Sequence, residues 1–143
     1  MILSLRFEVP LYFRTFALHF YGSVMNIEEF REYCLSLNGV TESMPFGPDT
    51  LVFKVMEKMF ALTNLSGDFS INLKCEPERA LQLREEFPAV LPGYHMNKQH
   101  WNTVIIDGSI EDETLRSWIA ISYDLIVASL PQNKKTLLQS GRF

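Results

Sequence analysis

The sequence predicts an α+β domain in which an antiparallel β-sheet packs against helices. A capped helix pattern near residue 26 comes first, and three β-rich runs separated by tight turns follow between residues 50 and 74. A long apolar helix pattern lies near the C-terminus. The 143 residues, 47% of them hydrophobic and 21% charged, suffice for one domain with a sizeable core. We expect the order N-terminal helix, β-meander, helix, strand and long C-terminal helix.

The first helix has a recognisable start and end. Asn26 is a suitable N-cap, and Glu29 stands at the third helical position, as in a capping box. Asn38-Gly39 is typical of a helix end. The apolar residues between them recur at helical spacing: Ile27, Phe30, Cys34 and Leu37.

A three-stranded meander follows the first helix. Residues 39–49 contain two prolines and two glycines, which favour turns. Residues 50–56 and 58–65 are β-rich and predict a hairpin with its turn at Glu57. In residues 69–74 apolar and polar side chains alternate, which predicts a third strand with one buried and one polar face.

The second half predicts a helix, a strand and a long helix. Pro77 suits the first position of a helix over residues 77–87, and residues 103–106 predict a strand. Ser109 with Asp112 resembles a capping box for a helix that runs to Leu130. Its apolar surface is wider than one sheet contact needs. We expect the first helix, the N-terminal segment or a second copy in a homodimer to cover the remainder.

The first 24 residues differ in composition from the rest because they are crowded with aromatic residues. We expect Met25 to be the natural start and residues 1–24 to be a non-native extension. The alternative is a genuine arm over an apolar surface. Residues 25–138 would form a single domain with a tail at 139–143. The longest uncharged run, residues 15–27, is too short to span a bilayer, so we expect no membrane association.

Charge and cysteine content limit the function. The net charge is −4, and residues 25–143 carry 11 basic against 16 acidic side chains. This balance argues against strong non-specific binding of nucleic acid, which usually requires a basic domain. Cys34 and Cys75 are 41 positions apart, and we expect both to be reduced and structural.

The most particular stretch is residues 92–108, a polar loop that leads into a strand. It contains the pattern H-x-N-K-x-H-W-x-T-V, which begins at His95 and ends at Val104. This pattern closely resembles the signature of the MmcQ/YjbR family of small bacterial proteins, and the resemblance extends from about Met25 to about Leu138. It implies an α+β double-wing fold, similar to secretion-chaperone-like and frataxin-like arrangements. The expected role is that of a bacterial cytoplasmic DNA-binding protein, which could be regulatory and would contact DNA through the His95–Trp101 loop and the hairpins.

The resemblance implies candidate nucleic-acid-binding residues, whose chemistry suits that ligand. Lysine and histidine can contact phosphate, amides can contact bases or backbone, and aromatic rings can stack on an unpaired base. Each also has a structural alternative, since the tryptophan could anchor the loop in the core, the histidines could satisfy local carbonyls, and the asparagine could fix a turn. The candidates are Lys74, His95, Asn97, Lys98, His100 and Trp101.

Enzyme motifs do not occur in the sequence. It has no phosphate-binding P-loop, dinucleotide-binding glycine motif, nucleophile elbow or H-E-x-x-H. His95 and His100 are five positions apart, which makes zinc binding a weak hypothesis. We therefore expect no enzyme, no cofactor and no metal. The alternative to DNA binding is a protein-interaction or chaperone-like module that uses a sheet face and the long apolar helix.

Overall fold

The computed structural model describes residues 24–143, which form the α+β fold that the sequence predicts. One six-stranded sheet has the order β1-β2-β3-β4-β6-β5, and every neighbouring pair is antiparallel. Residues 1–23, and with them the expectation of a non-native extension, lie outside the described residues. The strands are β1 Val40–Ser43, β2 Thr50–Val55, β3 Lys58–Asn64, β4 Ser70–Lys74, β5 Val90–Pro92 and β6 Trp101–Ile105.

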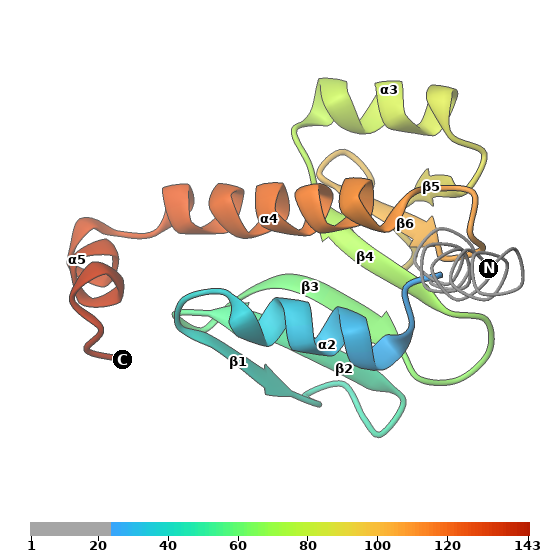
Figure 1. Cartoon of the computed structure of the whole chain (residues 1–143). Helices are drawn as coiled ribbons and strands as arrows, with labels where there is room; N and C mark the ends of the chain where they lie inside the picture. Colours follow the sequence, from blue (N-terminus) through green and yellow to red (C-terminus); the bar gives the residue numbers. More distant parts are fainter. Residues whose placement is uncertain (1–23) are drawn as a thin grey trace, which may run out of the picture.

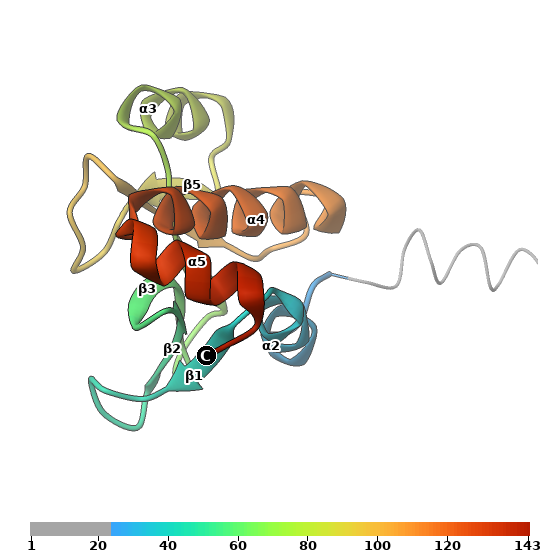
Figure 2. The same cartoon turned by 90° about the vertical axis from the view of Figure 1, so that its left-hand side faces the viewer.

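The helices of the described chain lie on one side of this sheet (Figure 1). Both α2 and the long α4 cross it, and α3 stands above the end that β5 and β6 form. The short α5 turns back from the end of α4 towards β1 (Figures 1 and 2). The helices are α2 Ile27–Ser36, α3 Pro77–Glu86, α4 Asp112–Ser129 and α5 Gln132–Ser140. None of these helices is both long and apolar enough to cross a membrane.

The predicted capping box at the start of α2 is confirmed. The Asn26 side chain accepts a hydrogen bond from the Glu29 backbone N–H at 2.8 Å, and the Glu29 carboxylate accepts one from the Asn26 N–H at 3.2 Å. The predicted β2–β3 hairpin is also confirmed. Its two turn residues, Met56 and Glu57, both have positive φ angles, as the turns that match strand twist require.

The long helix α4 is fixed to the sheet through one buried hydroxyl. Ser122 Oγ donates to the Phe60 carbonyl of β3 at 2.5 Å and accepts from the Lys74 N–H of β4 at 2.8 Å. The hydroxyl of Tyr123, whose ring packs edge-on against Phe60 of β3, donates to the Asn38 carbonyl just after α2 at 2.6 Å. The ring of Trp118 packs edge-on against Phe87, at the end of α3. The ends of α2 and α3 therefore cover part of the wide apolar surface of α4.

The structure corrects several expectations. β1 and β5 form where we expected turn and loop, and α5 occupies most of the stretch after Pro131 and reaches into the expected tail. The capping box at Ser109 is wrong, because Ser109 donates to Asp107 and the N-cap of α4 is Glu111. Instead, Asp112 Oδ1 accepts a hydrogen bond from the Met25 backbone nitrogen at 2.9 Å.

The sheet carries a separate apolar cluster on the face away from the helices. The main core fills the space between sheet and helices, whereas Val52, Leu62 and Trp101 pack together with Met59 and Met96. Paired residues in antiparallel strands project from the same face, and Val52 pairs with Leu62. We call this the open face, because none of the helices of the described chain crosses it.

Candidate nucleic-acid interface

The loop over residues 93–100, which contains most of the signature, connects β5 to β6 and is closed by its own hydrogen bonds. The Gly93 N–H donates to the Trp101 carbonyl at 2.9 Å, and the Asn97 carbonyl accepts from the N–H groups of His100 and Trp101. Asn97 Oδ1 also accepts from the Gln99 N–H at 2.9 Å, so this side chain fixes a turn. In Figure 2 the loop, drawn in tan, projects on the side of the sheet away from α2.

An arginine outside the signature fastens the loop to the body of the protein. Arg84 of α3 donates from Nε to Asn102 Oδ1 at 2.6 Å and from Nη2 to the carbonyls of Lys98 and Trp101. Asn102 is buried, and its Nδ2 donates to the Ala80 carbonyl at 3.3 Å. Arg84 is not among the site residues predicted from the sequence, because no local pattern connects residue 84 to residues 98–102.

The β4–β6 ladder brings Lys74 next to the signature. Lys74 pairs with Trp101, and the Cys75 N–H donates to the His100 carbonyl at 2.8 Å. Lys74 and Trp101 therefore project from the same open face. Lys54 of β2 lies on this face too, because it pairs with Met59, a member of the apolar cluster. Strand pairing thus places Lys74 next to His100, although these residues are 26 positions apart.

Trp101 is buried beneath this surface, in the apolar cluster of the open face. Its side chain packs against Val52 and Leu62, and only 8% of the residue is exposed. Its indole ring is therefore not free to stack on a base. Asn72, which we expected on a polar strand face, is likewise buried. It accepts a hydrogen bond from Thr103 Oγ1, which itself accepts one from the Tyr94 N–H at 2.9 Å.

The tip of the loop presents an exposed aromatic pair. Tyr94 is 68% exposed, and its ring centroid lies 4.0 Å from that of His95. His95 has φ +58°, a left-handed conformation that few non-glycine residues adopt. No side-chain hydrogen bond of His95 or His100 is found within residues 24–143. His95 is exposed and His100 is half-buried, so the loop presents the His95 imidazole more openly.

The loop forms a locally basic region in an acidic protein. Residues 87–106 contain Lys98, His95 and His100 and not a single Asp or Glu. Lys98 Nζ donates one hydrogen bond to the Gly93 carbonyl at 3.1 Å, which leaves its other two N–H donors for an anion. With Lys74 on the adjoining strand β4, and Lys54 on β2 further along the same face, the arrangement can bind phosphate groups.

The remaining titratable groups do not extend this region. Burial raises the pKa of the Cys34 and Cys75 thiols, and the structure contains both cysteines as free thiols, as expected. Hydrogen bonds from Ser109 lower the pKa of Asp107 at the far end of β6. Within residues 24–143, no three or more His, Cys, Asp and Glu side chains come close enough to hold a metal ion.

The fold and the loop together define the class of protein. It has a six-stranded antiparallel sheet with helices on one face, and a loop with histidine, lysine and tryptophan at the other face. The chain belongs to the YjbR family, whose model matches residues 35–125. It is 36% identical over 115 residues to YbdF of Escherichia coli O157:H7, covering 80% of this chain and 94% of that protein. It is 34% identical over 115 residues to Escherichia coli YjbR, covering 80% and 98%. Both relatives are described as uncharacterized proteins.

A solved structure has the same fold. The crystal structure of the Deinococcus radiodurans protein DR2400, with a domain described as DUF419, superposes with a TM-score of 0.76 at 36% identity. The match covers 81% of this chain and 89% of that one. The family resemblance and the fold predicted from the sequence are thereby confirmed.

Proposed function

We propose that this protein binds nucleic acid, with the 93–100 loop and the adjoining ends of β4 and β6 as the contact surface. The observation that carries the proposal is the placement of Lys74 next to the signature by the β4–β6 ladder. It brings a second lysine beside the loop that contains Lys98, His95 and His100 and lacks acidic residues. Phosphate binding needs such a local positive surface when the protein as a whole is acidic.

The loop tip favours single-stranded over double-stranded nucleic acid. An unpaired base can stack on the exposed ring of Tyr94, and such stacking does not depend on base identity. Lys98 and His95 then lie on the same short loop for contacts to the neighbouring phosphates. Trp101 has a positioning role in this proposal, since its buried ring supports the start of β6, where the loop ends. The β2–β3 hairpin, with Lys54 on the same face, serves as the flanking wing.

Fluorescence anisotropy tests the proposal. The full chain is titrated into labelled single- and double-stranded DNA over a series of salt concentrations. For single strands the logarithm of affinity falls by about 0.7 per phosphate contact for each tenfold increase in salt. Lys98→Gln, which retains an amide donor for the Gly93 carbonyl, should flatten that slope by about 0.7. Arg116→Gln on the exposed side of α4 is the matched control and should leave the slope unchanged.

Tyr94→Ala tests the stacking contact separately. It should weaken single-strand binding by about 1 kcal/mol or more without a change in salt slope. If neither form of DNA binds at low salt, or if the Lys98 and Arg116 variants behave alike, the proposal is wrong.

A protein-interaction role is the second candidate, and one observation favours it. Met44 and Phe46 in the β1–β2 loop are 44% and 68% exposed, although they are large apolar side chains only two positions apart. Exposed apolar side chains that cluster often mark contact sites for other proteins. A partner or a second copy that covers this loop would be detected by sedimentation of the full chain, and Phe46→Ser should abolish any association. A monomer that Phe46→Ser leaves unaltered would contradict this candidate.

A further inference from the structure

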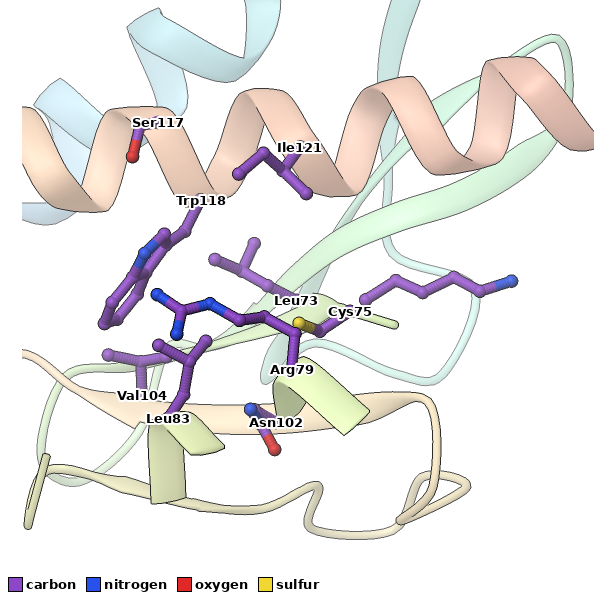
Figure 3. A pocket seen from close by; sticks show the side chains of 10 residues that line it. Leu73, Cys75, Arg79, Leu83, Asn102, Val104, Ser117, Trp118 and Ile121 are labelled. Carbon is purple, nitrogen blue, oxygen red and sulfur yellow. The ribbon is translucent and has the colours of Figure 1, made fainter. Parts of the chain in front are cut away.

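A pocket of about 210 Å³ lies between α3, α4 and the helix-covered face of the sheet, away from the signature loop (Figure 3). Leu73 and Val104 of the sheet form its floor. Leu83 of α3 and Trp118 of α4 form the opposing walls, and the ring of Trp118 is held by its edge-on contact with Phe87. The pocket exists because α3 and α4 each pack on the sheet and stand apart from one another (Figure 1).

The polar lining of this pocket is positively charged. Arg79 supplies this charge, since the side chain of Lys74 projects from the open face, and none of the lining residues is acidic. Figure 3 shows the Arg79 guanidinium extending from α3 towards Trp118 on the opposite wall. Arg79 is held only loosely, with Gln82 Oε1 at 3.4 Å and Glu86 Oε2 at 3.9 Å, and half of its side chain is exposed. A ligand carboxylate could therefore replace these weak contacts.

Some of the apolar side chains that line the pocket are exposed to solvent. Ile121 at the pocket is 49% exposed, and Trp118 is only partly buried. An apolar group that displaced water from these side chains would be stabilised by the hydrophobic effect. At about 210 Å³ the pocket is smaller than those that hold drug-sized ligands, which begin near 300 Å³. These dimensions suit a single ring or a branched chain.

We propose that this pocket binds a small organic carboxylate, with its aromatic or branched apolar body against Trp118 and its carboxylate on Arg79. The proposal does not depend on nucleic-acid binding. Asn102 connects the two sites, since it lines the pocket and also accepts the hydrogen bond from Arg84, which holds the loop. Ligand binding in the pocket would therefore affect the loop through Asn102 and Arg84.

In the test, phenylacetate is titrated into the isotope-labelled full chain. Binding is monitored by the NMR chemical shifts of the backbone amide and indole N–H groups. Phenylacetamide, which has the same shape without the charge, and acetate, which has the charge without the ring, are the comparison ligands. Phenylacetate should bind more tightly than either and should shift the signals of Leu73, Val104 and the Trp118 indole. If the shifts fall outside the pocket lining, or if phenylacetate and acetate bind equally, the proposal is overturned.

Two variants and one control assign the contacts. Arg79→Gln should weaken phenylacetate by up to about fivefold, the upper range for a solvent-accessible ion pair, and should leave phenylacetamide unchanged. Arg116→Gln removes an equal charge from α4 outside the pocket and should alter neither ligand. Ser117→Trp places a large ring at the exposed Ser117 and should exclude both ligands. Equal effects of the two arginine variants, or undiminished binding to a folded Ser117→Trp protein, would refute the proposal.

Discussion

Arg84 and Asn102 are joined by a hydrogen bond of 2.6 Å between Nε and Oδ1, which connects α3 to β6 just after the 93–100 loop. The same guanidinium group donates to the carbonyls of Lys98 and Trp101. One side chain from a helix therefore satisfies three acceptors in and beside the loop. The position of the candidate interface depends on this arginine.

Arg84→Gln should therefore lower the free energy of unfolding by about 1.5–3 kcal/mol, because hydrogen bonds to a charged donor are lost and the buried Asn102 oxygen is left without its partner. Urea denaturation measures the change. Arg79→Gln, on the same helix but more exposed, is the control and should fall within about 0.5 kcal/mol of the unmodified protein. Equal effects of the two substitutions would show that Arg84 does not anchor the loop.

Ser122→Ala should destabilise the protein by about 1–3 kcal/mol. The hydroxyl of Ser122 is buried between α4, β3 and β4, and its loss leaves the Phe60 carbonyl and the Lys74 N–H unsatisfied. Thermal and urea unfolding would both detect this change. Ser117→Ala on the same helix removes only an exposed hydrogen bond to the Thr114 carbonyl, and a loss as large as that of Ser122→Ala would argue against the buried bridge.

Gly93→Ala should distort the start of the loop. A Cβ atom at residue 93 would lie 2.8 Å from both Cβ and the carbonyl oxygen of Trp101, closer than real Cβ atoms approach. Crowding of this kind costs about 1–3 kcal/mol. Unfolding measurements should show that loss, and amide exchange should speed up at Trp101. Gln99→Ala in the same loop has no such contact, so a comparable loss there would point to general loop sensitivity instead.

The Arg31–Glu42 ion pair between α2 and β1 should make stability depend on pH. Hydrogen bonds from Arg31, with Nε–Oε2 at 2.7 Å, lower the pKa of Glu42 from its usual value of 4.5. A carboxylate whose pKa is lower in the folded than in the unfolded protein stabilises the fold at pH values above its unfolded-state pKa. This stabilisation is lost as the pH falls through its folded-state pKa. Arg31→Gln should therefore be less stable than the unmodified protein at pH 7, with the difference disappearing in acid below pH 4.5.

The double variant Arg31→Gln/Glu42→Gln is the control for this ion pair. It should be no less stable at pH 7 than the less stable of the two single variants, since each removes the same interaction. Losses that simply add would contradict the pairing.

The two cysteines should react slowly in the folded protein. Burial raises the pKa of both thiols, so the reactive thiolate is scarce at neutral pH. A disulfide reagent at pH 7 should modify Cys75 first, since it is 8% exposed at the wall of the pocket, and Cys34 only after unfolding in urea. Rapid modification of Cys34 without urea would contradict the packing of α2.

The sequence predicted those elements whose signals are local. The capping box at Asn26, the turn at Glu57 and the proline at position 77 each lie within a few residues of the element they define, and the structure has α2, the hairpin and α3 there. β1 and β5 were missed because they are short strands that exist only through pairing with a neighbour. Similarly, α5 is largely polar, and it is held by the distant contact of Leu138 with Asn38 and Gly39.

The candidate site was predictable in part. The signature identified the loop itself, and its residues from His95 to Trp101 are contiguous in sequence. By contrast, the burial of Trp101 against Val52 and the attachment of the loop through Arg84 depend on strand and helix placement across the fold. Whether a tryptophan is exposed for stacking or buried for support cannot be inferred from its neighbours in the sequence.

The two edges of the sheet have a consequence for self-association. β5 has three residues and ends at Pro92, which has no N–H donor, and β1 has only four residues. Short edges and edge prolines give an incoming strand few hydrogen-bonding groups to pair with. The described domain should therefore resist fibre-like growth by strand addition, and copies that do meet would have to do so through side chains on a face.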